Sequence, residues 1–198
     1  MKALIIFGHP DSNVGFAVNM LEAVKNRLKE GGSDFEVLDL YKMNYDPVLK
    51  TSELYTAGNR EVSPENLQIQ QKIKEANGLI FIYPVWWGGM PAIMKGFMDR
   101  VFTPWFAYKY RKDKFIKLLP DKLLADKKVV AFISFGSPKF VYAMLLHPVK
   151  IINKFIIFGL FAKKSKTFCI YKANSQTAKD RLPEINNVAT RGIDWLLK

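Results

Sequence analysis

The sequence predicts an α/β protein with a five-stranded parallel sheet and helices on both faces. Strand-like and helix-like segments alternate along the 198 residues, a pattern that places right-handed crossovers on both sides of a parallel sheet. The strand at residues 79–83 is a continuous apolar run without polar alternation, which is typical of a strand covered on both faces. The length favours one domain over residues 1–198.

The individual elements follow from apolar periodicity and from start and stop signals. We predict strands at residues 3–7, 35–40, 79–83, 129–134 and 167–171, and helices at residues 14–29, 63–76, 91–101, from 142 with a break near Pro148, and 177–197. Ser63 is the expected N-cap of the second helix. Pro183 is expected in the first turns of the last helix or just before it. Residues 41–63 lack periodicity and are predicted to be a long connection.

The most informative stretch is the loop Pro-Val-Trp-Trp-Gly-Gly at residues 84–89, directly after the buried strand. Open α/β sheets bind ligands beyond the carboxyl ends of their strands. Two adjacent indoles supply flat apolar area, and two glycines let the backbone approach a planar ring. The loop therefore predicts a site for an isoalloxazine ring. The alternative is that both tryptophans are core residues beneath a loop.

A second loop, residues 8–16, leaves the first strand and opens the first helix. Its backbone N–H groups and the positive end of the helix dipole could hold a phosphate. The loop contains neither a GxGxxG pattern nor a Walker lysine, which argues against a dinucleotide-binding Rossmann motif and a nucleoside triphosphatase. The alternative is that its Ser and Asn residues only cap the helix.

Charge and composition limit the partners. The net charge of +12 fits nucleic-acid binding, electrostatic attraction of anionic cofactors, or a solvated basic surface. No nucleic-acid-binding motif accompanies it, so we expect the solvated surface and no nucleic acid. No apolar run reaches membrane-spanning length, and the N-terminus does not resemble a signal peptide, so we expect a cytoplasmic protein without stable membrane association. The single cysteine, Cys169, excludes an internal disulfide, and we expect no metal site.

Three stretches of the sequence resemble the flavodoxin-like NAD(P)H:quinone oxidoreductases, which include DT-diaphorase-like and bacterial quinone reductases. They are YPVWWGGMPAIMKGFMDRVFTPWFAY at residues 83–108, KALIIFGHPDS at the N-terminus and DLYKMNYDPV at residues 39–48. The resemblance implies a flavodoxin-like homodimer with FAD, or alternatively FMN. It also implies a two-electron reductase in which NADPH or NADH passes a hydride to flavin N5 and a quinone-like acceptor then receives it. The alternative role is a flavin-binding accessory subunit of an ion-efflux system.

The resemblance also assigns roles to single residues. The implied cofactor contacts are His9, Asn13, Phe16, Ala17, Pro84, Val85, Trp86, Trp87, Gly88, Asp99, Ser134, Phe135 and Gly136. The implied substrate contacts, given to the neighbouring subunit, are Phe106, Tyr108 and Tyr110. Tyr142 would stabilise charge on the reduced ring. His147 lies one position from the family's active-site histidine, so a catalytic and a structural role both stay open.

Residues 140–162 are unusually apolar. We expect a helix and a turn packed at a dimer interface and over the acceptor pocket. The alternative is an apolar mouth for a lipophilic quinone, with transient membrane contact.

Overall fold

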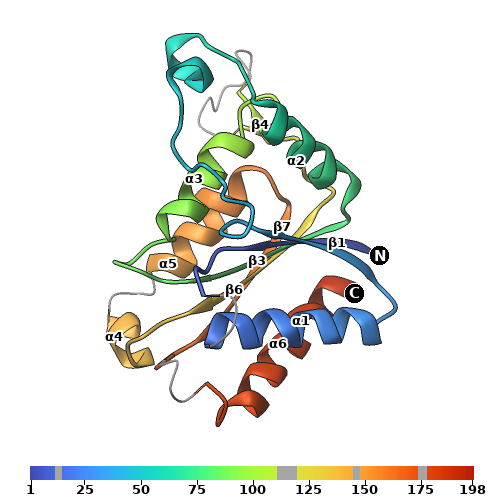
Figure 1. The fold of residues 1–198 in the computed structure, drawn as a ribbon, viewed down its shortest axis with the longest axis vertical. Helices are drawn as coiled ribbons and strands as arrows, with labels where there is room; N and C mark the ends of the chain where they lie inside the picture. Colours follow the sequence, from blue (N-terminus) through green and yellow to red (C-terminus); the bar gives the residue numbers. More distant parts are fainter. Residues whose placement is uncertain (12–14, 111–119, 145–147, 174–177) are drawn as a thin grey trace.

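The computed structural model describes residues 1–11, 15–110, 120–144, 148–173 and 178–198. Its main feature is a five-stranded parallel sheet in the order β2-β1-β3-β6-β7 (Figure 1). The strands are β1 (Lys2–Phe7), β2 (Asp34–Asp39), β3 (Gly78–Pro84), β6 (Lys128–Ser134) and β7 (Lys164–Ile170). β1 lies between β2 and β3, so the strand order reverses beside β1. The predicted sheet is confirmed, and this switch point is where such sheets bind ligands.

Helices cover both faces of the sheet, as the sequence predicts. The helices α1 (Phe16–Glu30) and α6 (Leu182–Leu197) pack on one face, and α2 (Pro64–Glu75) and α3 (Ala92–Val101) pack on the other (Figure 1). Strand β3 supplies Leu79, Phe81 and Tyr83 to one core and Ile80 and Ile82 to the other. All five are buried. The uninterrupted apolar run thus reflects burial on both sides.

The helix boundaries follow local chemistry. The Ser63 hydroxyl accepts a hydrogen bond from the backbone N–H of Asn66 at 3.3 Å, so the predicted N-cap of α2 is confirmed. α1 was predicted at residues 14–29; it runs from Phe16 to Glu30, with Gly31 as its C-cap. The last helix was predicted to begin at residue 177, whereas α6 begins at Leu182. Pro183 lies in its first turn, as predicted.

Residues 139–162 differ most from expectation. They form α4 (Lys139–Met144), α5 (Pro148–Ile151), the π-helical segment η3 (Ile152–Ile157) and the 3-10 helix η4 (Phe158–Leu160). The predicted start of helix at residue 142 was therefore three residues late. The structure also has a small antiparallel pair, β4 (Tyr108–Lys109) and β5 (Asp121–Lys122), which the sequence did not predict. Among the described residues, no helix is long and apolar enough to cross a membrane.

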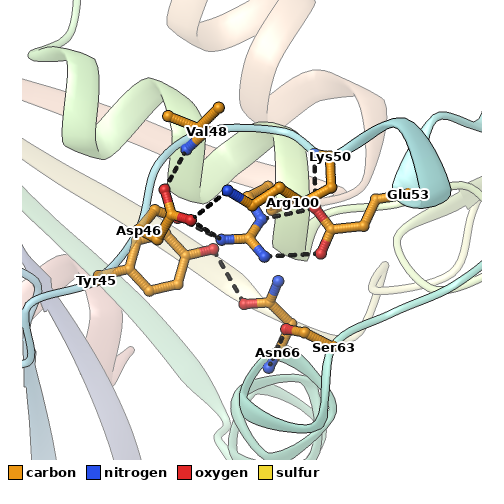
Figure 2. Close-up of polar contacts among 8 residues, drawn as sticks. All are labelled: Tyr45, Asp46, Val48, Lys50, Glu53, Ser63, Asn66 and Arg100. Atoms are coloured by element: carbon orange, nitrogen blue, oxygen red, sulfur yellow. Dashed lines mark hydrogen bonds and ion pairs between the residues drawn. The ribbon is translucent and has the colours of Figure 1, made fainter.

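The predicted long connection, residues 41–63, contains the 3-10 helices η1 (Thr51–Glu53) and η2 (Tyr55–Ala57). We call its residues 45–63 the strap. A buried ion pair fixes it to α3 (Figure 2). The Arg100 guanidinium donates to both carboxylate oxygens of Glu53, at 2.7 and 2.8 Å, and to the backbone carbonyl of Asp46. The Tyr45 hydroxyl donates to Asn66 Oδ1 at 3.0 Å, which ties the start of the strap to α2.

Candidate functional site

A cavity of about 380 Å³ opens at the carboxyl ends of β1, β3 and β6. This volume lies within the usual range of small-molecule pockets, about 300–1,000 Å³. Four loops supply its lining residues, which are His9, Asp11, Gly15, Phe16, Ala17, Pro84, Val85, Trp86, Ser134, Gly136 and Ala173. The structure therefore brings together the strand-end loops that the sequence analysis singled out.

The loop after β1 leads to the N-terminus of α1. Gly15 is the N-cap with φ 115°, a backbone conformation that favours glycine, and it has no side chain to cap the first turn. Backbone N–H groups at such a terminus attract anions. His9 lies beside them, with Nδ1 2.7 Å from the carbonyl oxygen of Asp11 and its ring centroid 6.3 Å from Trp86. This part of the cavity suits a phosphate.

The aromatic loop forms a tight turn between Trp86 and Gly89, whose backbones exchange hydrogen bonds of 3.1 and 3.0 Å. The two central residues, Trp87 and Gly88, both have positive φ, 51° and 76°. This is the φ pattern of a type I′ turn. Trp86 lines the cavity, whereas the Trp87 side chain is fully exposed and, with Gly88, is not among the lining residues. Only one of the two indoles therefore faces the site in the single chain.

The loop after β6 forms the opposite wall with Ser134 and Gly136. Phe135, an expected cofactor contact, is instead fully buried and stacks on Tyr171 with 5.2 Å between ring centroids. Tyr142 packs on Phe135 from α4, at 4.2 Å between ring centroids, and does not line the cavity either. Phe135 is buried beneath the loop and Tyr142 is half-buried against it, so neither side chain lines the cavity of the single chain, and their predicted contacts with a cofactor stay predictions.

Several other predicted residues lie away from this cavity. Asp99 is on α3, where it forms an exposed ion pair with Lys95. Phe106, Tyr108 and Tyr110 follow the C-terminal end of α3, at the opposite end of that helix from the aromatic loop. None of these four lines the cavity. Predicted contacts Asn13 and His147 lie outside the described residues.

Three lining residues were missed by sequence reasoning. Asp11 and Gly15 belong to the predicted phosphate loop, so their position in that loop was the available signal. Ala173 follows the last strand, and its backbone N–H donates to the Phe135 carbonyl at 2.8 Å. That hydrogen bond brings a fourth loop to the cavity, and a small apolar residue carries no sequence signal for it.

The cavity fits a flavin on grounds of shape and donors. Ideal Cβ atoms built on Gly89 and Gly136 meet no described atom within 4 Å, so the space beside both loops is open. Gly15 provides no side-chain cap for α1, so the N–H groups of the first turn suit a phosphate, and Val85 and Trp86 offer apolar surface to a ring. Among the described residues, no group of three or more His, Cys, Asp or Glu side chains could hold a metal ion. Burial raises the pKa of the Cys169 thiol, which disfavours its nucleophilic thiolate.

The sheet order and the cavity at its switch point define a flavodoxin-like α/β protein. Residues 1–188 match the family described as "Flavodoxin-like fold", and the chain belongs to this family.

The relatives of this chain include named oxidoreductases. The chain is 37% identical over 138 residues to an uncharacterized NAD(P)H oxidoreductase of Haemophilus influenzae, covering 69% of this chain and 65% of the relative. It is 33% identical over 161 residues to NAD(P)H dehydrogenase [quinone] 1 of Cavia porcellus, covering 72% and 56%. The chain thus spans less than two thirds of these relatives. The predicted resemblance to NAD(P)H:quinone oxidoreductases is confirmed.

Solved structures agree over nearly the whole chain. Smu.1420 from Streptococcus mutans superposes with a TM-score of 0.80 at 28% identity, covering 96% of this chain and 100% of that one. An NAD(P)H:quinone oxidoreductase from Methanothermobacter marburgensis has a TM-score of 0.78 at 25% identity, covering 96% and 98%.

Proposed function

We propose that this protein is a flavin-dependent oxidoreductase that passes two electrons from NADPH or NADH to a quinone-like acceptor. The observation that carries the proposal is one cavity that joins the N-terminus of α1 to the aromatic loop after β3. The names of the relatives from Haemophilus influenzae and Cavia porcellus support the same reaction class. No observation favours the accessory-subunit alternative, so we do not propose it.

Different lining residues would contact different parts of the flavin. His9, Phe16 and the first-turn N–H groups of α1 would hold the phosphate and the chain attached to it. Pro84, Val85 and Trp86 would pack against the ring, and the backbone around Ser134 and Gly136 would close its far edge. A bound flavin supplies a ring that accepts a hydride and returns it to a second molecule. The protein's part is to orient this ring and to leave one face open.

We further propose that the active unit is a homodimer with FAD, FMN being the alternative. Phe106, Tyr108 and Tyr110 lie at the far end of α3 from the cavity of their own chain. They could therefore serve as substrate contacts only in the cavity of a second copy. Asp99, exposed on α3, would face the dinucleotide end of the partner's cofactor in the same arrangement.

The test is an anaerobic titration of the flavin-loaded protein, followed by its visible spectrum. NADPH should bleach the flavin, and a soluble benzoquinone should restore its colour. Chromatography of the released cofactor distinguishes FAD from FMN. A protein that retains no flavin, or a flavin that the quinone does not reoxidise, would contradict the proposal.

A pair of variants locates the flavin. Trp86→Ala removes a lining indole and should weaken flavin binding by about 1–3 kcal/mol, the usual value of a stacking contact. Leu67→Ala on α2 is the control, because this side chain is 53% exposed, comparable to 43% for Trp86, and does not line the cavity. Equal flavin affinity in both variants would place the ring elsewhere.

A further inference from the structure

A second cavity, of about 520 Å³, lies at the other end of α3 from the candidate flavin site. Its lining residues come mainly from α2, the strap and the loop that follows α3. Figure 1 shows these segments in its upper part. The two cavities share no lining residue. α3 has ten residues, so about 15 Å of helix separates them. Of its lining residues, Phe106 alone has a role in the proposed reaction, as a substrate contact in the cavity of a second copy.

A buried amide contributes to its wall. Gln70 of α2 is only 7% exposed, and its Nε2 donates to the Val101 carbonyl at 2.9 Å and to Thr103 Oγ1 at 3.3 Å. Both of these hydrogen bonds use the amide nitrogen, and the amide oxygen Oε1 accepts none from the described residues. Because Gln70 is a lining residue, we assign its amide oxygen as the acceptor for a donor on the ligand.

The rest of the lining combines aromatic rings with the cations Arg60 and Lys74, and a third cation, Lys109, lies next to the lining residue Trp105. The Arg60 guanidinium lies 5.7 Å from the ring centroids of both Tyr55 and Trp105. Lys109 Nζ lies 4.6 Å from the Trp105 ring centroid, and Lys74 Nζ lies 5.8 Å from that of Phe106. Within the described part of the chain, none of these three cations forms an ion pair with a carboxylate.

The carboxylates at the cavity do not cancel this charge. Glu53 already accepts two hydrogen bonds from Arg100. Glu61 is the other acidic side chain in the lining. Because Glu53 is paired with Arg100, Glu61 is the one lining carboxylate that opposes the two lining cations, Arg60 and Lys74. The aromatic rings offer flat surfaces at the same place. An anion that carries a planar ring satisfies both features.

We propose that this second cavity binds a planar aromatic anion that also carries a hydrogen-bond donor. The ring packs on Trp105, the anionic group binds Arg60 and Lys74, and the donor binds Gln70 Oε1. A purine nucleoside monophosphate and a hydroxybenzoate both have this chemistry. The larger nucleotide makes fuller use of a 520 Å³ cavity. This site does not depend on the proposed reductase activity.

Calorimetric titration of the full-length protein, saturated with flavin, tests the proposal. The probes are adenosine 5′-monophosphate and 4-hydroxybenzoate, with adenosine as the uncharged control. We expect one site per chain and at least about tenfold weaker binding of adenosine than of its monophosphate, because the charged contacts are lost. The affinities of the two anions show whether the cavity prefers a phosphate on a nucleoside or a carboxylate on a benzene ring.

Variants at exposed residues should leave the fold intact, so a loss of binding in them reports on the ligand contact. Arg60→Ala and Trp105→Ala should each weaken binding about tenfold. Arg191→Ala is the matched control, because Arg191 lies 5.9 Å from the Phe168 ring centroid and does not line the cavity. Its affinity should equal that of the wild type. Gln70→Leu should weaken binding of probes that carry a donor, with a thermal melt to verify folding.

Three outcomes overturn the proposal. They are no binding of either anion at millimolar concentration, unchanged binding in Arg60→Ala and Trp105→Ala, and binding that disappears when flavin is added. The last would mean that the probes occupy the first cavity. In the proposed homodimer Phe106 meets the partner's first cavity, so the titration uses the protein in its solution assembly, and a second cavity that the partner closes gives the first outcome. If the protein binds no flavin, the proposed function fails, but the second cavity can still be tested. The titration is then done without flavin, and weaker binding in Arg60→Ala and Trp105→Ala than in Arg191→Ala supports the proposal.

Discussion

Arg100 carries the strongest polar contact between the strap and α3. Its side chain and that of Glu53 are each only 6% exposed, and they pair in bidentate geometry. Removing one charge from a buried pair leaves the other without compensation, which costs about 3–5 kcal/mol. Glu53→Gln should therefore lower the free energy of unfolding by about 3 kcal/mol at pH 7, measured by urea denaturation. Asp99→Asn, which breaks an exposed pair, should cost less than about 1 kcal/mol.

The same pair predicts how stability depends on pH. Hydrogen bonds from the Arg100 guanidinium lower the pKa of Glu53 in the folded protein. A depressed carboxyl pKa stabilises the fold above the unfolded value, about 4.3, and this contribution is lost as the pH falls through the folded value. Urea denaturation from pH 7 to pH 2 should give a shallower acid loss for Glu53→Gln than for the wild type. Parallel curves would contradict the prediction.

Trp87 combines a strained backbone with an exposed side chain. Its φ of 51° lies in the left-handed region, where a non-glycine residue costs about 1–2 kcal/mol. Asparagine tolerates this conformation, so Trp87→Asn should raise the free energy of unfolding by about 0.5–1 kcal/mol. Trp87→Ala is the control, since it removes the same indole without relieving the backbone. If Trp87 covers the flavin as the resemblance implies, both variants should lose flavin affinity in an equilibrium titration.

At the scale of elements, α3 and the strap meet at a glycine. A Cβ on Gly96 would lie 2.1 Å from the Pro47 carbonyl oxygen, so the strap backbone approaches the helix too closely for a side chain. Gly96→Ala should destabilise the protein by about 1–3 kcal/mol despite the better helix propensity of alanine. Thermal unfolding against Lys95→Ala, an exposed neighbour on the same helix, measures the difference. A stabilised Gly96→Ala variant would show that the strap moves away without cost.

The elements that the sequence predicted well have strong local signals. The β3 run is apolar throughout, and α2 has a serine cap followed by proline. Residues 139–162 lack such signals because nearly every position is apolar, so no face stands out and tertiary packing decides the segment. Asn153 shows this, since its Nδ2 donates to the buried Tyr83 hydroxyl at 2.8 Å, a contact no local pattern reveals.

At the scale of the whole molecule, the candidate site was predictable where the topology determines it. Parallel strands end at one edge, so the sequence alone could place His9, Val85 and Ser134 together. It could not separate Trp86 from Trp87, because a turn with two positive φ values decides which indole faces the cavity. Nor could it place Tyr108, whose predicted role depends on a second chain.

The net charge of +12 gives a prediction that belongs to the whole molecule. A basic surface attracts an anionic donor over long range, and salt screens this attraction, since the Debye length falls from about 30 Å at 0.01 M to about 10 Å at 0.1 M. The second-order rate constant for flavin reduction by NADPH should therefore fall about tenfold between 0.01 and 0.5 M ionic strength in stopped-flow measurements. NADH, which lacks the 2′-phosphate, should show a smaller slope, and reoxidation by an uncharged quinone should show none. If the quinone step has the same salt dependence as the NADPH step, salt acts on the enzyme itself and the basic surface does not steer the donor.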